Sequence, residues 1–419
     1  MESVFGTGSM ERALSGDEVR QICSATIEGL PLDGRRVLVL IPDYTRHAPI
    51  DLFFDILTDL LYRRVKSLDF LVATGTHAPM PLERIYNLVG ITDADHRTRF
   101  QKINFFNHEH ANPDALTTLG NLPAGEVAAL TNGLFGQELN ITINRKAVEY
   151  DHIIIVSPVV PHEAMGFAGG NKYFFPGIGG LDVIETFHWL AAVITNPVVN
   201  GVKDTPTRRV IDRAVEFLPT PRTCFAFAVN GRHEIACLFG GEPKAAWSKA
   251  ADYSARLHIT YKEKPYKRIL GITPPIYDDI WVAGKAMYKL EPIAAEGAEL
   301  IIYGPHIKEI SFTHGEEIRR IGYHVRDYFT GQWDRFANEP KLILAHSTNV
   351  KGIGKFSNGV EEPRINVTLA TSIPEEVCKQ VNLGYRDPRT INLDEWRRDT
   401  DDDLLVVEGA GQILHRLRN

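Results

Sequence analysis

Short apolar runs separated by polar loops recur along the first half of the chain. Those at residues 35–43, 68–73 and 151–160 are continuous, as expected for strands buried on both faces of a parallel sheet. Between the first two, apolar side chains recur at helical spacing, which predicts a helix over residues 50–64. Weaker patterns predict helices at 81–88 and 245–257 and strands at 103–106 and 138–144. The order of strand, loop and helix favours parallel strands joined by right-handed crossovers.

The same pattern starts again near residue 267. It predicts strands at 267–272, 300–303 and 342–346 and helices at 279–290, 316–322 and 375–381, followed by a solvated charged face at 394–403. Residues 261–267, YKEKPYK, interrupt the apolar pattern with charge and a proline. We therefore predict two α/β domains with mainly parallel sheets, residues 1–265 and 266–403, with the active site in the cleft between them. Residues 404–419 could pack back on the first domain.

Composition narrows the class of protein. A chain of 419 residues with 44% hydrophobic and 24% charged residues is typical of a soluble two-domain protein. The net charge of −7 argues against a nucleic-acid partner, and no apolar run is long enough to span a membrane. The N-terminal residues lack the features of a signal peptide, and four scattered cysteines indicate a reducing compartment. A cytoplasmic protein is expected.

Residues 162–180, HEAMGFAGGNKYFFPGIGG, combine an imidazole, a lysine and six glycines. Glycines allow the backbone to approach a ligand closely, and their N–H groups can form an anion-binding nest. Lys172 precedes three aromatic residues, and an apolar setting would favour its neutral, nucleophilic form. A glycine-rich surface loop with a solvated lysine explains the same residues. The spacing does not match a phosphate-binding Walker loop.

Polar loops follow three of the predicted strands, where ligands bind in open α/β sheets. Arg46 follows the first strand, His77 the second, and His162 with Lys172 the strand at 151–160. An arginine there could hold a carboxylate, and the histidines could exchange protons near neutral pH. Each residue also has a simpler interpretation, as a surface arginine or as a histidine that bonds the backbone.

Three other histidines are candidate metal ligands. His188 lies between two aromatic residues, where packing is the simpler interpretation and metal ligation the alternative. His108 and His110 have the short spacing of a metal pair, but their turn-like sequence favours a solvated loop. Neither HExxH nor a zinc cysteine set is present.

The motifs DYTRHAP, ATGTH and H-x3-GF-x-GG-x-K-x3-PG, followed by a further histidine, occur here in that order. Together they resemble the lactate racemase family, whose members use the nickel-pincer nucleotide (pyridinium-3-thioamide-5-thiocarboxylic acid mononucleotide) with Ni(II). The resemblance extends through most of the chain, including the stretches 239–257 and 274–289. It is most specific in the glycine and lysine motif and its two histidines.

The resemblance implies a role for each matching residue. Lys172 would carry the cofactor through a thioamide bond, and His188 would be the one protein ligand to nickel. His77 and His162 would be the acid/base pair on either side of the substrate. The substrate itself would contact Arg46, through its carboxylate, and Lys285, with Trp281 and Trp333 nearby. The remaining matches would shape the first loop or contact the cofactor: Asp43, Thr45, Thr74, Gly75 and Gly170.

In the family, inversion of the carbinol carbon is described as hydride transfer to the cofactor and back to the other face of a planar 2-keto acid. The cofactor performs the difficult step, and the protein orients the substrate and moves protons. This chain would depend on separate enzymes that make the cofactor.

The chain departs from the family pattern near the substrate. Trp281 and Val282 stand where the lactate enzymes have a tyrosine and a glutamine, and Asn171 and Trp189 also differ from expectation. These changes argue against lactate and favour another 2-hydroxy acid, such as a larger one or a sugar acid.

Two other functions fit the same residues. Lys172 could form a Schiff base in an aldolase or dehydratase, with His77 and His162 as acid and base. The glycine nest and Arg46 could instead belong to a non-catalytic protein that binds an anionic metabolite. Neither alternative requires nickel.

Overall fold

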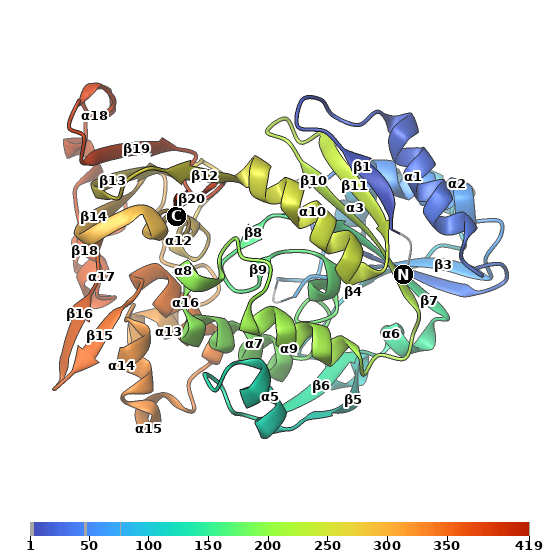
Figure 1. The fold of residues 1–419 in the computed structure, drawn as a ribbon, viewed down its shortest axis with the longest axis horizontal. Coiled ribbons are helices and arrows are strands. Elements are labelled where there is room, and N and C mark those ends of the chain that lie inside the picture. Colours follow the sequence, from blue (N-terminus) through green and yellow to red (C-terminus); the bar gives the residue numbers. More distant parts are fainter. Residues whose placement is uncertain (1–3, 46–47, 76, 419) are drawn as a thin grey trace. The chain divides into compact units, whose positions relative to one another are not determined.

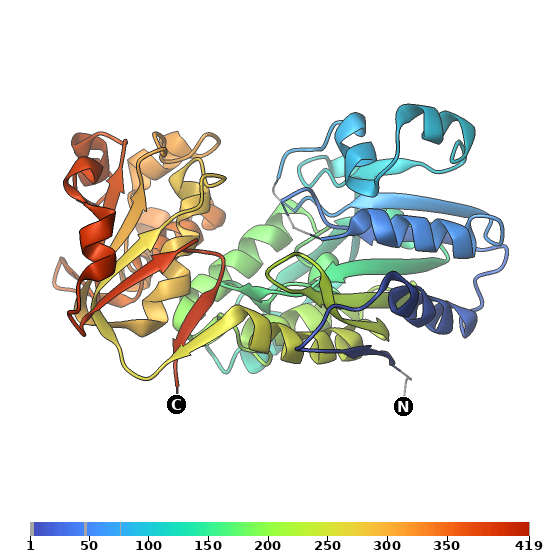
Figure 2. The same cartoon turned by 90° about the horizontal axis from the view of Figure 1, so that it is seen from above.

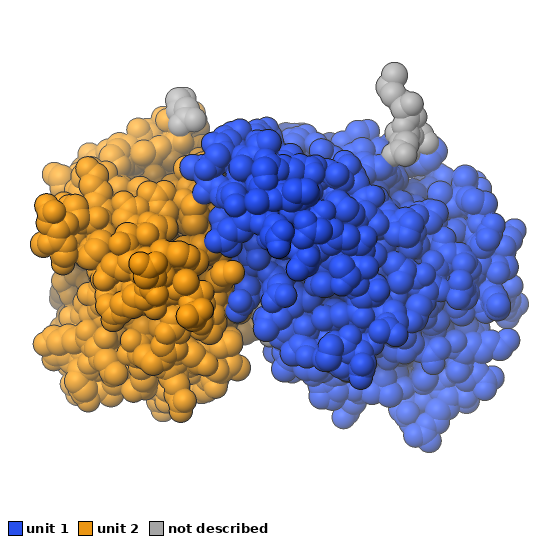
Figure 3. Space-filling model, turned by 90° about the horizontal axis from the view of Figure 1, so that it is seen from below, with its two compact units in different colours: residues 1–160, 167–186, 203–257 blue, residues 161–166, 187–202, 258–419 orange. Residues whose placement is uncertain are grey.

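The computed structural model describes residues 4–45, 48–75 and 77–418. The chain divides into two compact units, coloured separately in Figure 3. Unit 1 comprises residues 1–160, 167–186 and 203–257, and unit 2 comprises 161–166, 187–202 and 258–419. The division therefore passes through the glycine and lysine motif as well as between residues 257 and 258.

Unit 1 is built on a seven-stranded sheet in the described part of the chain, with the order β1-β11-β10-β7-β2-β3-β4. Its strands are β1 (Phe5–Gly8), β2 (Arg36–Ile41), β3 (Ser67–Val72), β4 (Phe105–Asn107), β7 (His152–Pro158), β10 (Arg222–Val229) and β11 (Ile235–Gly241). The pairs from β10 through β7, β2 and β3 to β4 are parallel, and β1 and β10 both pair antiparallel with β11. Because β3 and β4 lie on one side of β2 and β7 on the other, the winding direction reverses between β2 and β7.

Helices cover this sheet because their apolar faces pack on its buried strands. Helix α1 (Gly16–Glu28) begins with a capping box at Ser15 and Glu18, and α2 (Ile50–Leu61) buries Phe53, Phe54 and Leu57. These side chains join the strand residues in one hydrophobic core, and both helices lie along one face of the sheet in Figure 2. The other helices before the glycine motif are α3 (Leu82–Val89), α4 (Asp93–Thr98), η1 (Pro113–Ala115), α5 (Ala124–Leu130) and α6 (Lys146–Glu149).

A separate hairpin and the glycine region complete this part of the chain. Strands β5 (Leu116–Leu122) and β6 (Leu139–Asn144) pair antiparallel. The glycine region contains β8 (Pro161–His162), β9 (Gly166–Phe167), η2 (Gly170–Tyr173), α7 (Leu181–Ile194) and α8 (Asn196–Val199). Helices α9 (Pro206–Val215) and α10 (Pro243–His258) follow (Figure 1). Helix α7 begins in unit 1 and ends in unit 2.

Unit 2 contains a five-stranded, fully parallel sheet among its described residues, with the order β18-β17-β14-β13-β19. The strands are β13 (Tyr266–Ile272), β14 (Ala294–Gly304), β17 (Asn366–Thr371), β18 (Gly384–Tyr385) and β19 (Leu404–Glu408). The winding direction reverses between β13 and β19. Shorter pairs are β12 (Ile259–Lys262) with β20 (Leu414–Leu417), and β15 (Gly354–Ser357) with β16 (Val360–Pro363).

The helices of unit 2 connect these strands. They are α11 (Ile280–Ala283), α12 (Lys285–Leu290), η3 (Glu291–Ile293), α13 (Gly315–Ile321), α14 (Arg326–Thr330), α15 (Trp333–Phe336), α16 (Lys341–Lys351), α17 (Glu375–Gln380), η4 (Pro388–Thr390) and α18 (Leu393–Arg398). Ile391 and Leu393, at the start of α18, pack on one face of the sheet.

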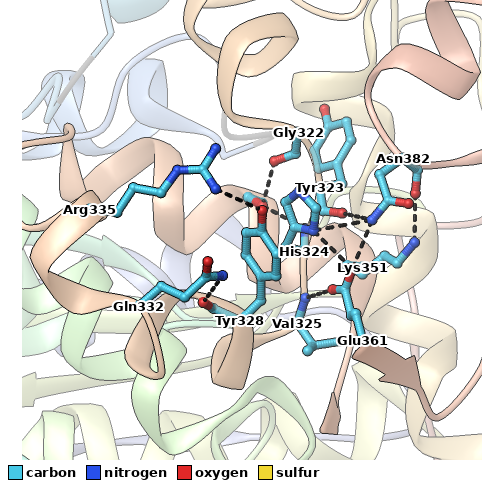
Figure 4. A network of polar contacts seen from close by, with 11 residues as sticks. Gly322, Tyr323, His324, Val325, Tyr328, Gln332, Arg335, Lys351, Glu361 and Asn382 are labelled. Atoms are coloured by element: carbon cyan, nitrogen blue, oxygen red, sulfur yellow. Dashed lines mark hydrogen bonds and ion pairs between the residues drawn. The ribbon is translucent and has the colours of Figure 1, made fainter. Parts of the chain in front are cut away.

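A polar network joins α14, α16 and β16 inside unit 2 (Figure 4). Glu361 accepts hydrogen bonds from the Val325 amide and from Asn382, and it pairs with His324 at 2.9 Å. Lys351 donates to the carbonyl of Asn382 at 2.6 Å. Burial raises the pKa of Glu361, but the bonds from His324 and Val325 and the nearby positive charges outweigh burial and hold this pKa below its ordinary value.

The prediction of two α/β domains with mainly parallel sheets is confirmed, but some elements differ. Residues 342–346, predicted as a strand, lie in α16, because an apolar run alone does not separate a buried helix from a strand. Pro340 before this helix and Gly352 after it are the signals that the pattern overlooked. The helix predicted at 279–290 is divided at Gly284.

The C-terminal residues 404–419 belong to unit 2 rather than packing back on the first domain. Strand β19 pairs with β13, and β20 pairs with β12. The two apolar runs therefore complete the second unit. None of the helices in the described ranges has the length and apolar character that a membrane crossing requires.

Candidate active site

The predicted cofactor residues of unit 1 lie in the loops that follow β2, β3 and β7. These three strands are neighbours, and the sheet reverses its winding between β2 and β7. In parallel sheets this reversal opens a crevice at the carboxyl ends of the strands, where ligands bind. The topology therefore brings together at one edge Asp43, Thr45, Thr74, Gly75, His77, Gly170 and Lys172.

Asp43 organises the first of these loops. Its carboxylate is buried and accepts hydrogen bonds from the Thr45 amide at 3.1 Å and the Thr45 hydroxyl at 2.6 Å. Its other oxygen accepts a close hydrogen bond from His77 Nδ1. The His77 side chain is 47% exposed, so Nε2 remains available to a ligand. A carboxylate behind Nδ1 fixes the tautomer in which Nε2 is the basic atom.

The loop after β3 is joined to the glycine loop by backbone hydrogen bonds. The Gly75 amide donates to the Gly177 carbonyl at 3.1 Å, and Gly75 has φ +58° with open space where a side chain would lie. The buried Thr74 hydroxyl donates to the His108 carbonyl at 2.9 Å. These bonds fix the backbone that carries His77 relative to the loop that carries Lys172.

His108 is a structural residue rather than part of a solvated loop. Its ring is buried, and its Nε2 donates to the Gly179 carbonyl at 2.8 Å. Burial lowers the pKa of His108 to about 4, so the ring is neutral at physiological pH. This hydrogen bond joins the segment that follows β4 to the end of the glycine motif.

Two residues that the sequence did not single out hold the glycine loop. Arg208, on α9, is buried and donates from Nη1 to the Gly169 carbonyl at 3.2 Å and from Nη2 to the Phe167 carbonyl. The Ala168 carbonyl accepts a hydrogen bond of 2.9 Å from Trp247 Nε1, and the Arg208 guanidinium lies 4.1 Å from the centre of the Trp247 ring. Side chains of α9 and α10 therefore bind three successive carbonyls of the glycine loop.

This support explains the glycines before the lysine. Gly169 and Gly170 have φ of +88° and +58°, and a Cβ on Gly170 would lie 2.8 Å from Trp247 Cβ. The Gly170 amide donates to the Ser157 hydroxyl at 2.8 Å. Lys172 follows in η2 and is partly buried. No local sequence pattern indicates that Arg208 and Trp247 contact the glycine loop, because both residues lie far along the chain from it.

His162 and His188 lie in the two inserted segments that belong to unit 2. His162 is buried, and its Nδ1 accepts a hydrogen bond from the Ala164 amide at 3.1 Å. The same Nδ1 lies 3.5 Å from a carboxylate oxygen of Glu163. Nearby, Lys289 donates to the Pro161 carbonyl at 3.2 Å, which anchors this segment within unit 2.

His188 is in the second half of α7, and the next residue explains its aromatic surroundings. Trp189 is buried and stacks on Trp333, with ring centres 5.4 Å apart and planes 15° apart. Arg326 also donates to the Val193 carbonyl at 3.0 Å, near the end of α7. Trp333 thus contacts the neighbour of the predicted nickel ligand.

The predicted residues Lys285 and Trp281 lie at the carboxyl edge of the second sheet. Lys285 begins α12, and its Nζ is 5.4 Å from the centre of the Tyr277 ring. A Cβ on Gly411, after β19, would lie 2.9 Å from Lys285 Cβ. Lys285 therefore lies where the loops after β13 and β19 meet, at the reversal of the second sheet. Trp281 is one helical turn earlier, and Arg46 lies outside the described residues.

Among the described residues no group of three or more His, Cys, Asp or Glu side chains could hold a metal ion.

Comparisons with known proteins were made for sequence and for structure. Residues 11–199 match the model of the lactate racemase N-terminal domain. Lactate racemase from Thermoanaerobacterium thermosaccharolyticum is 24% identical over 320 residues, which cover 74% of this chain and 66% of that enzyme, just under two thirds of its length.

Two solved structures are similar over nearly the whole chain. A crystal structure of a Thermotoga maritima protein is 35% identical, with a TM-score of 0.85 over 97% of this chain and 99% of that one. The lactate racemase apoprotein from Thermoanaerobacterium thermosaccharolyticum has a TM-score of 0.72 at 19% identity, covering 99% of this chain and 94% of that one. The second likeness shows that the fold is shared.

Proposed function

This chain belongs to the lactate racemase family, and on that premise we propose that it is an isomerase, a racemase or epimerase that inverts the carbinol carbon of a 2-hydroxy acid. The observation that carries the proposal is the pair of Asp43 and His77 at the same sheet edge as the glycine loop with Lys172. A base backed by a carboxylate beside a lysine in a glycine-rich loop suits cofactor-dependent proton transfer.

We propose that the residues around Lys172 hold a nickel-pincer nucleotide. Lys172 would form the covalent link, and His188 would be the protein ligand to Ni(II). The open space at Gly75 suits a bulky planar group close to the backbone. When bound, this cofactor would supply a reversible acceptor for the hydride of the carbinol carbon.

The part of the protein in the reaction is to move the hydroxyl proton. His77, with Nδ1–H donated to Asp43, presents Nε2 as a base, and this ring can take the hydroxyl proton as the carbinol becomes a 2-keto acid. We propose His162 as the second acid/base histidine, which would serve the opposite enantiomer.

The substrate would be bound by positive charge and by aromatic surface. Arg46 is proposed to bind the carboxylate, and Lys285 lies at the reversal of the second sheet, where a ligand is expected. Trp281 is a large ring at a position where we expected a polar contact in enzymes that act on lactate. We therefore propose a substrate larger than lactate.

The cofactor proposal can be tested on protein produced together with cofactor-making enzymes. We expect an intact-mass increase that maps to Lys172 and about one nickel per chain, with neither in the variant Lys172→Arg. Lys244→Arg is the matched control, because Lys244 is an exposed lysine that pairs with Asp212. Absence of adduct and nickel, while a known family member loads in the same host, would refute the cofactor proposal.

The reaction can be tested with the loaded protein and 2-hydroxy acids deuterated at the carbinol carbon. We expect inversion on a chiral column with the label retained in the product, because a hydride that returns from a cofactor does not exchange with water. In the absence of adduct, trapping of a carbonyl substrate on Lys172 by borohydride would instead indicate the Schiff-base enzyme.

A further inference from the structure

The loops after β13 and β14 in unit 2 form one joined platform. Asp279 is buried, and its carboxylate accepts hydrogen bonds from the Val282 amide at 3.0 Å and from the Phe312 amide at 3.1 Å. The Trp281 amide donates to the Ile310 carbonyl at 3.0 Å. These bonds cross between two loops at the carboxyl edge of a parallel sheet, which is a usual place for a ligand.

The side chains on this platform combine aromatic and imidazole rings. The Trp281 ring lies between His314, with centroids 4.4 Å apart, and His346, with centroids 4.2 Å apart. Trp281 and His314 are each partly exposed, whereas His346 is buried. Phe312 and Ile276, from the same two loops, are 66% and 65% exposed. Both loops therefore expose apolar surface at this edge of the sheet.

The two histidines differ in what their nitrogens contact. His346 Nε2 is 3.4 Å from the Tyr323 hydroxyl. For the ring of His314 no hydrogen bond is found within the described part of the chain, although the ring is half-buried against Trp281. Burial lowers the pKa of His314, against the opposing charges of Glu317 and Asp279, so its ring is neutral near pH 7. A neutral imidazole can donate one hydrogen bond and accept another.

We propose that His314 is a specificity-determining residue that, with Trp281, binds the part of the substrate beyond the carbinol carbon. The indole provides a flat apolar surface, and the imidazole beside it provides one donor and one acceptor. This combination suits 2-hydroxy acids whose chain carries further hydroxyl groups, because each hydroxyl needs a partner and its carbon atoms can lie on a ring. The inference rests on the proposed function, and it names the substrate class for that site.

The test compares two substrates of equal chain length on the loaded enzyme: 2-hydroxybutanoate and 2,3,4-trihydroxybutanoate. The variant His314→Phe keeps a ring against Trp281 and removes both nitrogens, whereas His314→Gln keeps hydrogen-bonding groups and loses the ring. For His314→Phe we expect kcat/KM to fall roughly 3- to 10-fold with the trihydroxy acid and to stay within about twofold with 2-hydroxybutanoate, as for one lost hydrogen bond. His314→Gln should recover part of the loss.

Three results would overturn the inference while leaving the proposed function intact. The first is an equal loss for both substrates, which would indicate that His314 only packs. The second is unchanged kcat/KM for both substrates. The third is a wild-type enzyme that inverts lactate or 2-hydroxybutanoate but not the trihydroxy acid. If the loaded wild-type enzyme inverts no hydroxy acid at all, the proposed function fails, and this inference fails with it.

Discussion

The buried Arg208 offers the sharpest test of how the glycine loop is held. In the variant Arg208→Met, a side chain of similar length replaces the guanidinium. The Phe167 carbonyl then loses the bond from Arg208, and the Gly169 carbonyl retains the bond from the Lys172 amide at 3.3 Å. The cation–π contact between the guanidinium and the Trp247 ring, 4.1 Å from its centre, is also lost. The change removes hydrogen bonds without opening a large cavity.

The expected cost follows from those contacts. A hydrogen bond from a charged donor contributes about 1.5–3 kcal/mol, so two such bonds give an upper value of about 3–6 kcal/mol. Burial of the charge offsets part of this, and it lowers the pKa of Arg208 to about 10. We therefore expect Arg208→Met to lower the free energy of unfolding of unit 1 by about 2–4 kcal/mol.

The adjacent residue provides the matched control. Arg209 is on the same helix, but its side chain is 39% exposed and pairs with an Asp204 that is 71% exposed. Arg209→Met should change stability by less than about 0.5–1 kcal/mol. Urea unfolding followed by tryptophan fluorescence gives both values, and hydrogen exchange of residues 163–180 shows whether the loop opens locally. A loss below about 1 kcal/mol for Arg208→Met, with unchanged exchange, would refute the role of Arg208.

Three further outcomes are expected. Gly170→Ala should lower stability by about 1–3 kcal/mol and prevent cofactor loading, because its Cβ would lie 2.8 Å from Trp247 Cβ in a left-handed conformation; normal loading in the mass assay would contradict this. Asp43→Asn should lower turnover roughly 10- to 100-fold and change its pH profile, because the carboxylate fixes the His77 tautomer; an unchanged profile would exclude this role. Glu361→Gln should flatten the acid limb of the stability curve. A carboxyl whose folded pKa is depressed stabilises the fold above its unfolded pKa of about 4.3, and this stability is lost as pH falls through the folded value. The free energy of unfolding is measured by urea unfolding at pH 3 to 6, and the same pH dependence in wild type and variant would contradict this prediction.

The sequence predicted the parallel core well because buried strands leave a strong signal. The continuous apolar run at 151–160 is typical of a strand buried on both faces, and β7 lies within that run. The run at 342–346 was misread because helix and strand share the same local composition when all faces are buried. Helix α16 was recognisable only from its flanking Pro340 and Gly352.

The positions of the candidate residues could be predicted where they depend on strand order, and the residues that support them could not, because that support depends on long-range contacts. The loops after β2, β3 and β7 gather at one edge because the strand ends of a parallel sheet do so. Arg208 and Trp247 support Lys172 from helices 36 and 75 residues further along the chain, and no local pattern indicates that contact. His108 was predicted to lie in a solvated loop, but its ring is buried and bonds the Gly179 carbonyl. That contact joins residues 71 positions apart, so the local sequence does not indicate it. The residues that hold a site are set by tertiary packing, whereas residue types suited to its chemistry stand out in the sequence.

The allocation of residues 187–202 to unit 2 has a consequence for biosynthesis. Gly201 packs against Leu414 and Ile259, and Arg416 bonds the carbonyl of Asn200. The segment that carries His188 therefore acquires these partners only after residues 414–416 have been synthesised, although domains usually fold in order during synthesis. Until then a nascent chain would hold His188 without these contacts.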